Sequence, residues 1–347
     1  MRKIGLVGFG VGGSNYHAPL ITTTEDLQLA GIVTRSAERK QLINARYPDT
    51  PVFNSLTEML DAGVDTVVIS TPPDSRLSLI EQALKAGIPV VSDKPFAMDY
   101  SSAVRIKSLS EKYSTPVSVF MNRRWDSDVL TVRHLLSTGK LGKLRRLYNG
   151  IEAFAPENEG NASGGGLLRD LGSHLIDQQV MLLGPVASVY AQVDAVLHDP
   201  ELNDAFNLTL VHESGQHSQV NGFMMQHNPG PRFRADGESA SFQIDGLDIQ
   251  TEQAFAGHHP HSHEIEWGVE PQEKWGTLFS NGKSEKFPSE QGNWPAFYLA
   301  LKNALKGDGC MPVDVDDAVH VTAILDAALI SARENRVVAI EEITGDK

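Results

Sequence analysis

The sequence has a single cysteine, Cys310, among its 347 residues. One thiol cannot build a disulfide framework or a multi-cysteine zinc or iron–sulfur site, so both kinds of protein are excluded. Basic residues are also in the minority, since 30 lysines and arginines face 44 aspartates and glutamates, a formal net charge of −14. So acidic a chain is a poor general binder of polyanions, and we expect neither nucleic acid nor a membrane surface as its main partner.

Long apolar runs are missing as well. No stretch approaches the roughly 18 uninterrupted apolar residues of a transmembrane helix. The opening MRKIGLVGFG holds only a short apolar run broken by glycines, without a signal-peptide cleavage site. From these absences we expect a soluble, cytoplasmic protein.

The chain does have an ordinary globular composition, 41% hydrophobic and 21% charged, and enough length for about two domains. Residues 1–121 alternate short unbroken apolar runs with helix-like stretches. This alternation predicts a doubly wound parallel sheet with helices on both faces, an α/β fold. The apolar runs are residues 4–7, 27–33, 66–69, 89–91 and 116–121.

Residues 122–347 have a different pattern. Longer segments of strand character, punctuated by Gly, Asn and Asp, predict an α+β domain with a large, mostly antiparallel open sheet. A helical spacing of apolar residues over 315–334 predicts a last long helix that packs back on the first domain. We place the domain boundary at residue 121. The predicted strands are 144–154, 187–196, 207–211, 219–225 and 239–249.

A glycine-rich loop follows the first predicted strand. Gly8, Gly10 and Gly13 form the pattern G-x-G-x-x-G between a strand and a helix, the context of a dinucleotide-binding loop. The first glycine allows a tight turn, the second lets backbone approach a pyrophosphate, and the third permits close helix–strand packing. Pro19 lies early in the expected helix, so we expect an irregular first turn. An ordinary flexible turn is the alternative.

The end of the second predicted strand bears on the choice between NAD and NADP. An NAD site usually places an acidic residue there to bind the ribose 2′-hydroxyl. Hydroxyl and cationic groups suit a 2′-phosphate instead, so the pattern here favours NADP over NAD. A solvated, basic start of a helix is the alternative. The residues in question are Thr34, Arg35 and Ser36, followed by Arg39 and Lys40.

Lys94 lies just beyond the apolar run 89–91 and directly before Pro95. Ligands bind beyond the carboxyl ends of strands in a doubly wound sheet, and the proline disfavours a helical conformation at Lys94. A lysine beside a nicotinamide can hydrogen-bond the reacting oxygen and stabilise developing negative charge. Taken alone, a lysine in this place is also typical of a protein surface.

The segment 164–177, GGGLLRDLGSHLID, places Asp170, His174 and Asp177 at i, i+4 and i+7 of an expected helix 168–183. At that spacing the three side chains share one face. Histidine suits proton transfer near neutrality, and we expect the Asp170 carboxylate to orient the ring and raise its pKa. The alternatives are a structural histidine and a zinc site, for which no fourth ligand is evident.

These motifs together resemble the Gfo/Idh/MocA family, which includes glucose–fructose oxidoreductase and inositol dehydrogenases. The glycine loop, Asp93-Lys94-Pro95 as a form of the family's Glu-Lys-Pro motif, and the segment 164–177 occur in family order over nearly the whole chain. Residues 122–128 and 170–178, with the segment His17-Ala18-Pro19-Leu20, are similar to the NADP-dependent scyllo-inositol 2-dehydrogenase subgroup.

The resemblance implies a Rossmann domain, hydride transfer between a nicotinamide and a secondary alcohol of a sugar or cyclitol, and an inositol-like substrate. It implies a homodimer or homotetramer formed through the large sheet. Carried over by motif, Lys94 binds the substrate hydroxyl, His174 accepts and donates its proton, and Asp170 contacts both His174 and the substrate. Arg123 would approach the nicotinamide, while Asp177 matches a family position without a definite role.

Two departures from the family pattern stand out. Thr71 and Pro72 can still line the cofactor, but Pro73 and Arg76 stand where the family commonly has asparagine and histidine. The loop 155–163 lacks the basic and aromatic residues expected of the inositol subgroup, which leaves the substrate open. A cofactor-recycling sugar oxidoreductase, a redox-assisted lyase and a non-catalytic NADPH-sensing regulator remain alternatives.

Several other residues receive a non-catalytic interpretation. The histidine-rich segment 258–263 is interpreted as an exposed loop, although such a cluster can bind a transition metal. Cys310 lies in a turn-like context without a nearby base. Trp267, Trp275 and Trp294 are expected to pack the second domain, with stacking on a sugar as the alternative.

Overall fold

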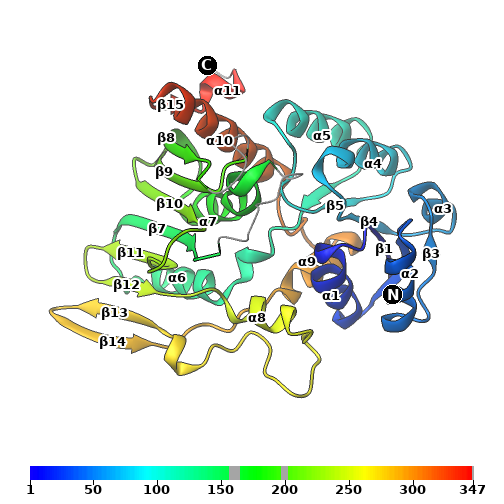
Figure 1. Ribbon diagram of the computed structural model, residues 1–347, viewed down its shortest axis with the longest axis horizontal. Coiled ribbons are helices and arrows are strands. Elements are labelled where there is room, and N and C mark those ends of the chain that lie inside the picture. The colour runs from blue at the N-terminus through cyan, green and yellow to red at the C-terminus, as the bar shows by residue number, and fades with distance from the viewer. Residues whose placement is uncertain (156–164, 197–201, 346–347) are drawn as a thin grey trace.

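The first sheet carries the glycine loop. In the computed structural model, which describes residues 1–155, 165–196 and 202–345, six parallel strands run in the order β3-β2-β1-β4-β5-β6 (Figure 1). The order reverses between β1 and β4, and the carboxyl ends of strands at such a point form a ligand-binding crevice. The strands are β1 (Arg2–Val7), β2 (Leu27–Val33), β3 (Val52–Phe53), β4 (Thr66–Ile69), β5 (Val90–Ser92) and β6 (Val117–Val119).

Helices cover both faces of this sheet (Figure 1). Every residue of β4, β5 and β6 is buried, as expected of strands between two helical layers. The chain enters the first helix through a π-helical segment, Gly12–His17, and Pro19 lies in the first turn of the α-helix that follows. The predicted irregular start is confirmed. The helices are α1 (Ala18–Thr23), α2 (Ala37–Arg46), α3 (Leu56–Asp61), α4 (Pro73–Lys85) and α5 (Tyr100–Lys112).

The second sheet has nine strands in the order β14-β13-β12-β11-β7-β10-β9-β8-β15. Its strand pairs are antiparallel except for β10 and β7, which are parallel. The strands are β7 (Leu144–Glu152), β8 (Val186–Asp194), β9 (Ala205–His212), β10 (His217–Phe223), β11 (Phe233–Gly237), β12 (Ser241–Ile244), β13 (Gly276–Ser280), β14 (Lys283–Phe287) and β15 (Val338–Ala339).

The helices of the second half of the chain lie on one face of this sheet and between the two sheets (Figure 1). Two of them, α7 (Ser173–Leu183) and α10 (Val315–Glu334), share a core with β8, β9 and β10. The remaining helices are α6 (Ser127–Ser137), α8 (Ile249–Phe255), α9 (Pro295–Lys306) and α11 (Glu341–Thr344).

The carboxyl-terminal helices also contact the first half of the chain. Phe297, Tyr298 and Leu301 of α9 are completely buried in the same core as the strands of the first sheet. On α10, Asp316 pairs with Lys107 of α5, with Nζ and Oδ1 2.6 Å apart. The two sheets are thus joined by packed helices, and the division at residue 121 stays a prediction.

The predicted fold class is confirmed, and the predicted strands correspond closely to β1, β2, β4 to β10 and β12. One range is wrong in part: over 239–249, β12 ends at Ile244 and α8 already begins at Ile249. Trp267 and Trp294 contact each other and donate hydrogen bonds to Gln250 and Asp126 of the second half of the chain, and both also belong to the core that covers the first sheet. Apart from Ala155, the loop 155–163 lies outside the described residues.

Candidate active site

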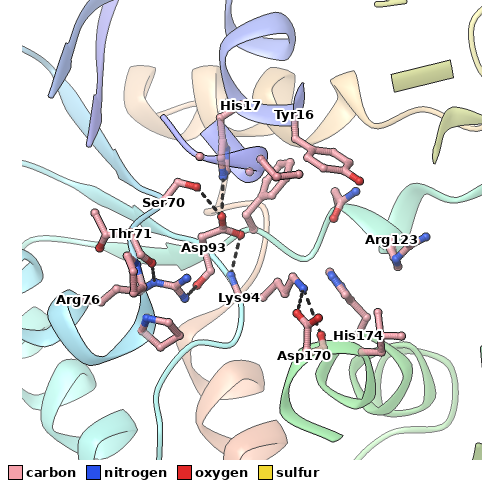
Figure 2. Close-up of a pocket in the computed structure, with 18 of the residues that line it drawn as sticks. Tyr16, His17, Ser70, Thr71, Arg76, Asp93, Lys94, Arg123, Asp170 and His174 are labelled. Atoms are coloured by element: carbon pink, nitrogen blue, oxygen red, sulfur yellow. Dashed lines mark hydrogen bonds and ion pairs between the residues drawn. The ribbon is translucent and has the colours of Figure 1, made fainter. Parts of the chain in front are cut away.

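A cavity of about 490 Å³ opens at the carboxyl ends of β1, β4, β5 and β6 (Figure 2). The glycine loop forms one wall, and the segments after β4 and β5 form the floor. The turn 122–125, the start of the helical segment 168–183, and α8 close the side towards the second sheet. The predicted residues Gly10, Thr71, Pro72, Lys94, Arg123, Asp170 and His174 all line this one cavity.

The three glycines of the loop meet different local demands. Gly8 has φ +100°, and a Cβ there would lie 2.4 Å from the carbonyl oxygen of Ser70. A Cβ on Gly13 would lie 2.4 Å from the carbonyl oxygen of Gly8, so helix and strand pack too closely for any side chain. Beside Gly10 the space is open, its nearest neighbour being Arg39 Nη2 at 4.0 Å. The loop therefore fits a dinucleotide, with exposed backbone at the N-terminus of a helix.

The polar residues after β2 divide into two groups. Thr34 Oγ1 accepts from the Ser36 amide, and Ser36 Oγ caps α2 by accepting from the Arg39 amide, each at 3.3 Å. Arg35 and Arg39 are exposed, and neither forms an ion pair with another described residue. Both guanidinium groups are thus uncompensated and lie outside the cavity itself, and that of Arg39 lies beside Gly10.

Lys94 and Asp170 form the centre of the site. The Lys94 ammonium donates to a carboxylate oxygen of Asp170 and, at 3.3 Å, to the Asp170 carbonyl oxygen. These residues come from the loop after β5 and from the π-helical segment Leu168–Gly172. Both side chains remain about one-quarter exposed, so the pair faces the cavity rather than the core.

His174 lies beside this pair (Figure 2). Its Nδ1 is buried and has no hydrogen-bond partner among the described residues. Burial lowers the pKa of His174 well below its usual value, and the charges of Lys94 and Arg123 lower it further. The expected pairing with Asp170 is therefore wrong, because that carboxylate is engaged by Lys94, and the pKa is lowered rather than raised. A neutral ring with an unpartnered nitrogen results.

Arg123 lines the same cavity and lies near His174 (Figure 2). Its guanidinium donates to Asp126 Oδ2 at 3.1 Å and reaches Thr251 Oγ1 of α8 at 3.4 Å. Asp126 also accepts from Trp294 Nε1 at 2.7 Å. Asp126 and Thr251, both in the second half of the chain, thus fix the position of the Arg123 guanidinium.

A second polar network, not predicted from the sequence, surrounds Asp93. Its carboxylate accepts from Ser70 Oγ at 2.7 Å and from the Lys94 amide at 2.8 Å. The completely buried His17 lies 3.4 Å from the same carboxylate and 2.6 Å from Tyr298 Oη. The hydrogen bonds and cationic neighbours hold the pKa of Asp93 well below its usual value despite burial. Family-like motifs at His17 and Asp93 were the only signal of this network.

The comparison with known families decides the relationship. Residues 2–121 match the oxidoreductase family with an NAD-binding Rossmann fold, Gfo/Idh/MocA, and residues 129–243 match the C-terminal domain of that family. The chain belongs to the Gfo/Idh/MocA family. This result confirms the resemblance carried by the sequence motifs.

Relatives of this Gfo/Idh/MocA protein include named dehydrogenases. The scyllo-inositol 2-dehydrogenase (NADP(+)) IolW of Bacillus subtilis is 30% identical over 98% of this chain and 96% of that protein. The D-apiose dehydrogenase of Rhizobium rhizogenes is 26% identical over 55% of this chain and 57% of that protein. The solved structure of yvaA from Bacillus subtilis superposes with a TM-score of 0.91 at 29% identity, covering 98% of each chain. The predicted class, an NAD(P)-dependent oxidoreductase acting on CH–OH groups, agrees with these findings.

Asp177 lies outside the cavity of this family member. Its carboxylate accepts two hydrogen bonds from Arg124, Nε at 2.8 Å and Nη2 at 2.6 Å. The same Nη2 donates to Asp317 of α10 at 2.8 Å. The helical segment 168–183 therefore directs Asp170 and His174 into the cavity and Asp177 into an ion-pair network between α7, the turn 122–125 and α10.

Replacing Asp177 by alanine is expected to lower the free energy of unfolding by about 3 kcal/mol, because it leaves the buried Arg124 with one carboxylate instead of two. Turnover at 25 °C should change little. Urea unfolding and steady-state kinetics measure both quantities. Glu238→Ala, which removes an exposed ion pair with Arg145, is the control and should affect stability much less. A large loss of turnover with unchanged stability would contradict this structural role.

The remaining features singled out in the sequence lie away from the cavity. The segment 258–263 forms turns after α8, where His258 Nδ1 is 4.0 Å from Glu264 Oε2. Over the described residues there is no group of three or more His, Cys, Asp or Glu side chains able to hold a metal ion. Cys310 is an exposed free thiol. None of the helices in the described part of the chain has the length and apolarity to cross a membrane.

Proposed function

We propose that this protein is an NADP-dependent dehydrogenase that transfers hydride between nicotinamide and a secondary alcohol or ketone of a sugar or cyclitol, with an inositol-like substrate favoured. The observation that carries the proposal is the convergence of Lys94, Asp170 and a neutral, unpartnered His174 beside the glycine loop. A cation, a carboxylate and a neutral base within one cavity are the groups that alcohol oxidation requires.

The roles of the side chains follow from their protonation states. Lys94 would donate a hydrogen bond to the substrate oxygen and stabilise its negative charge. His174 would accept the hydroxyl proton during oxidation and return it during reduction, because its lowered pKa keeps the ring neutral at pH 7. Asp170 holds the Lys94 ammonium and can accept a hydrogen bond from a second substrate hydroxyl.

The residues that would hold the cofactor lie along one path from β2 to the centre of the cavity. When bound, the nicotinamide supplies the hydride acceptor or donor. Backbone groups of the glycine loop would bind the pyrophosphate, and Thr71, Pro72 and Arg123 would enclose the nicotinamide end beside Lys94. At the other end, the residues proposed for the 2′-phosphate are Thr34, Arg35, Ser36 and Arg39.

The preference for NADP rests on the free guanidinium groups of Arg35 and Arg39. Replacing both by alanine is expected to lower kcat/KM for NADPH relative to NADH by about 10–100-fold, because each removes a charge-assisted hydrogen bond to the 2′-phosphate. Initial rates with the two cofactors give the ratio. Arg46→Ala, at the other end of α2, is the control. An unchanged ratio would refute the NADP assignment.

The substrate is tested by a panel of inositols, hexoses and their keto forms, assayed in parallel with NADP and NAD by the absorbance of the reduced cofactor. We expect turnover of a cyclitol, as the name of the Bacillus subtilis relative suggests, while turnover of a hexose and of no inositol would favour a sugar dehydrogenase, as the name of the D-apiose dehydrogenase suggests. Purification with tightly bound cofactor and no net NADPH formation would favour a cofactor-recycling enzyme. Absence of turnover despite NADPH binding would favour a sensing regulator.

We further propose a homodimer or homotetramer formed through the second sheet. The face of this sheet away from α7 and α10 is covered by no described helix, and Arg146, Tyr148, Thr209 and Gln219 line a depression on it. Light scattering on the purified protein measures the assembly, and a monomeric mass at micromolar concentration would refute it.

A further inference from the structure

Arg76 is a buried arginine at the floor of the cavity, in the first turns of α4. Only 5% of the residue is exposed. Its Nε donates to the carbonyl oxygen of Thr71 at 2.7 Å, and its Nη1 donates to the carbonyl oxygens of Asp93 and Pro95, both at 2.5 Å. Three backbone acceptors thus converge on one planar guanidinium, and Figure 2 shows it beside Thr71 and Asp93.

The three carbonyl groups belong to two separate parts of the cavity. Thr71 is in the segment after β4 that lines the proposed cofactor site, whereas Asp93 and Pro95 flank Lys94 in the loop after β5. Arg76 therefore binds the backbone on both sides of Lys94 and joins it to the cofactor wall. The fixed, planar fork of a guanidinium is suited to such an arrangement, which a lysine ammonium cannot reproduce.

The surrounding charges fit this placement. Burial alone disfavours a cation, and it lowers the pKa of Arg76, while the nearby carboxylates of Asp93 and Asp170 act in the opposite direction. The side chain forms no ion pair with any described residue, and its three hydrogen bonds are all donated to backbone oxygens. Arg76 therefore acts by holding the two loops in place through hydrogen bonds rather than by forming a salt bridge.

We propose that Arg76 is a positioning residue, which fixes the distance between Lys94 and the cofactor wall by binding the carbonyl groups of both segments. This inference rests on the proposed function, in which Lys94 binds the reacting oxygen next to the nicotinamide. We call the three hydrogen bonds of Arg76 to these carbonyl groups the clamp. Small displacements of reacting groups lower rates strongly. Loss of the clamp should therefore slow the chemical step more than it weakens cofactor binding.

The test compares Arg76→Gln and Arg76→Lys with the wild type. For Arg76→Gln we expect kcat to fall about 10–100-fold, the dissociation constant for NADPH, measured by fluorescence, to stay within about threefold, and the primary deuterium isotope effect to rise. Arg76→Lys keeps the charge without the planar fork, so we expect an intermediate kcat. Hydrogen–deuterium exchange of the cofactor-free protein should accelerate in the segment 93–97 and not in β1. Arg105→Gln, which removes an exposed contact with Glu81, is the control.

Several results would overturn the proposal. Unchanged kcat and isotope effect in a folded Arg76→Gln variant would show that the clamp is not needed for catalysis. If that variant does not fold, a wild-type kcat in Arg76→Lys would have the same meaning. If the wild-type protein binds NADPH but turns over no member of the substrate panel, the proposed function is refuted instead. In that case, accelerated hydrogen–deuterium exchange at 93–97 in Arg76→Gln would still support the clamp.

Discussion

Replacing Lys94 by methionine is expected to lower kcat by about 10²–10³-fold, because it removes the one ammonium that faces the reacting oxygen in the proposed reaction. Methionine keeps the length and apolar stem of lysine, so the cavity keeps its shape. The Asp170 carboxylate loses its partner but is partly exposed, and water can replace the ammonium there. NADPH affinity should therefore stay within about threefold of the wild type, since the glycine loop and the arginines after β2 are untouched.

Steady-state kinetics and fluorescence titration with NADPH separate the two effects of this substitution. Lys85→Met is the matched control, because Lys85 is an exposed lysine of α4 that forms an ion pair with Glu81 away from the cavity. A Lys94→Met variant with full turnover would refute the assignment of the oxyanion role. If NADPH binding is lost together with turnover, Lys94 binds the cofactor rather than the substrate.

Replacing His174 by alanine is expected to lower kcat for alcohol oxidation by about 10²–10⁴-fold, the usual contribution of a positioned general base. The wild-type pH dependence follows from the direction of the pKa shift. A base must be unprotonated to accept a proton, and burial together with Lys94 and Arg123 lowers the pKa of His174. The ring is therefore competent over a wider acidic range than an ordinary histidine, and the loss of activity on acidification should begin below about pH 6.5.

The measurement is kcat/KM for oxidation between about pH 4.5 and 8.5, in the wild type and in His174→Ala. The acidic limb should disappear from the profile of the variant. His134→Ala is the control, because that half-exposed histidine lies on α6, where its ring contacts Glu290 and Phe287 and does not line the cavity. An identical limb in the variant, or a wild-type limb above about pH 7, would exclude His174 as the base.

The sequence predicted best those features that local chemistry determines. The glycine spacing required a strand before it and a helix after it, and the apolar runs of the first half could be buried on both faces only in a parallel sheet. In the second sheet the prediction was less complete. Short or polar strands such as β14 and β15 lack an apolar alternation, because four of the five residues of β14 are exposed and β15 has only two residues. The strand conformation of β14 comes from pairing with β13, which directly precedes it, whereas β15 pairs with β8, which is distant in sequence.

Within the site, the sequence identified the residue types but not their partners. Asp170 precedes His174 by one helical turn, so local spacing predicted that they would pair. Lys94, 76 positions away, competes for the same carboxylate, and no local pattern shows that contact. The sequence likewise marked Arg76 only as a departure from a family motif. Its function depends on three carbonyl groups from two loops, which only the folded backbone brings together.

The hydrogen bond between His17 and Tyr298 spans 281 positions, and this span affects how the protein is made. At a synthesis rate of about 5–20 residues per second, roughly 15–55 s separate the emergence of His17 from that of Tyr298. Until then α9 cannot cover the apolar surface around Phe120, which its rings contact in the finished fold. The nucleotide-binding half leaves the ribosome before the second half, yet its core is complete only once α9 has been made. The nascent chain is therefore exposed to aggregation and chaperone binding throughout that interval.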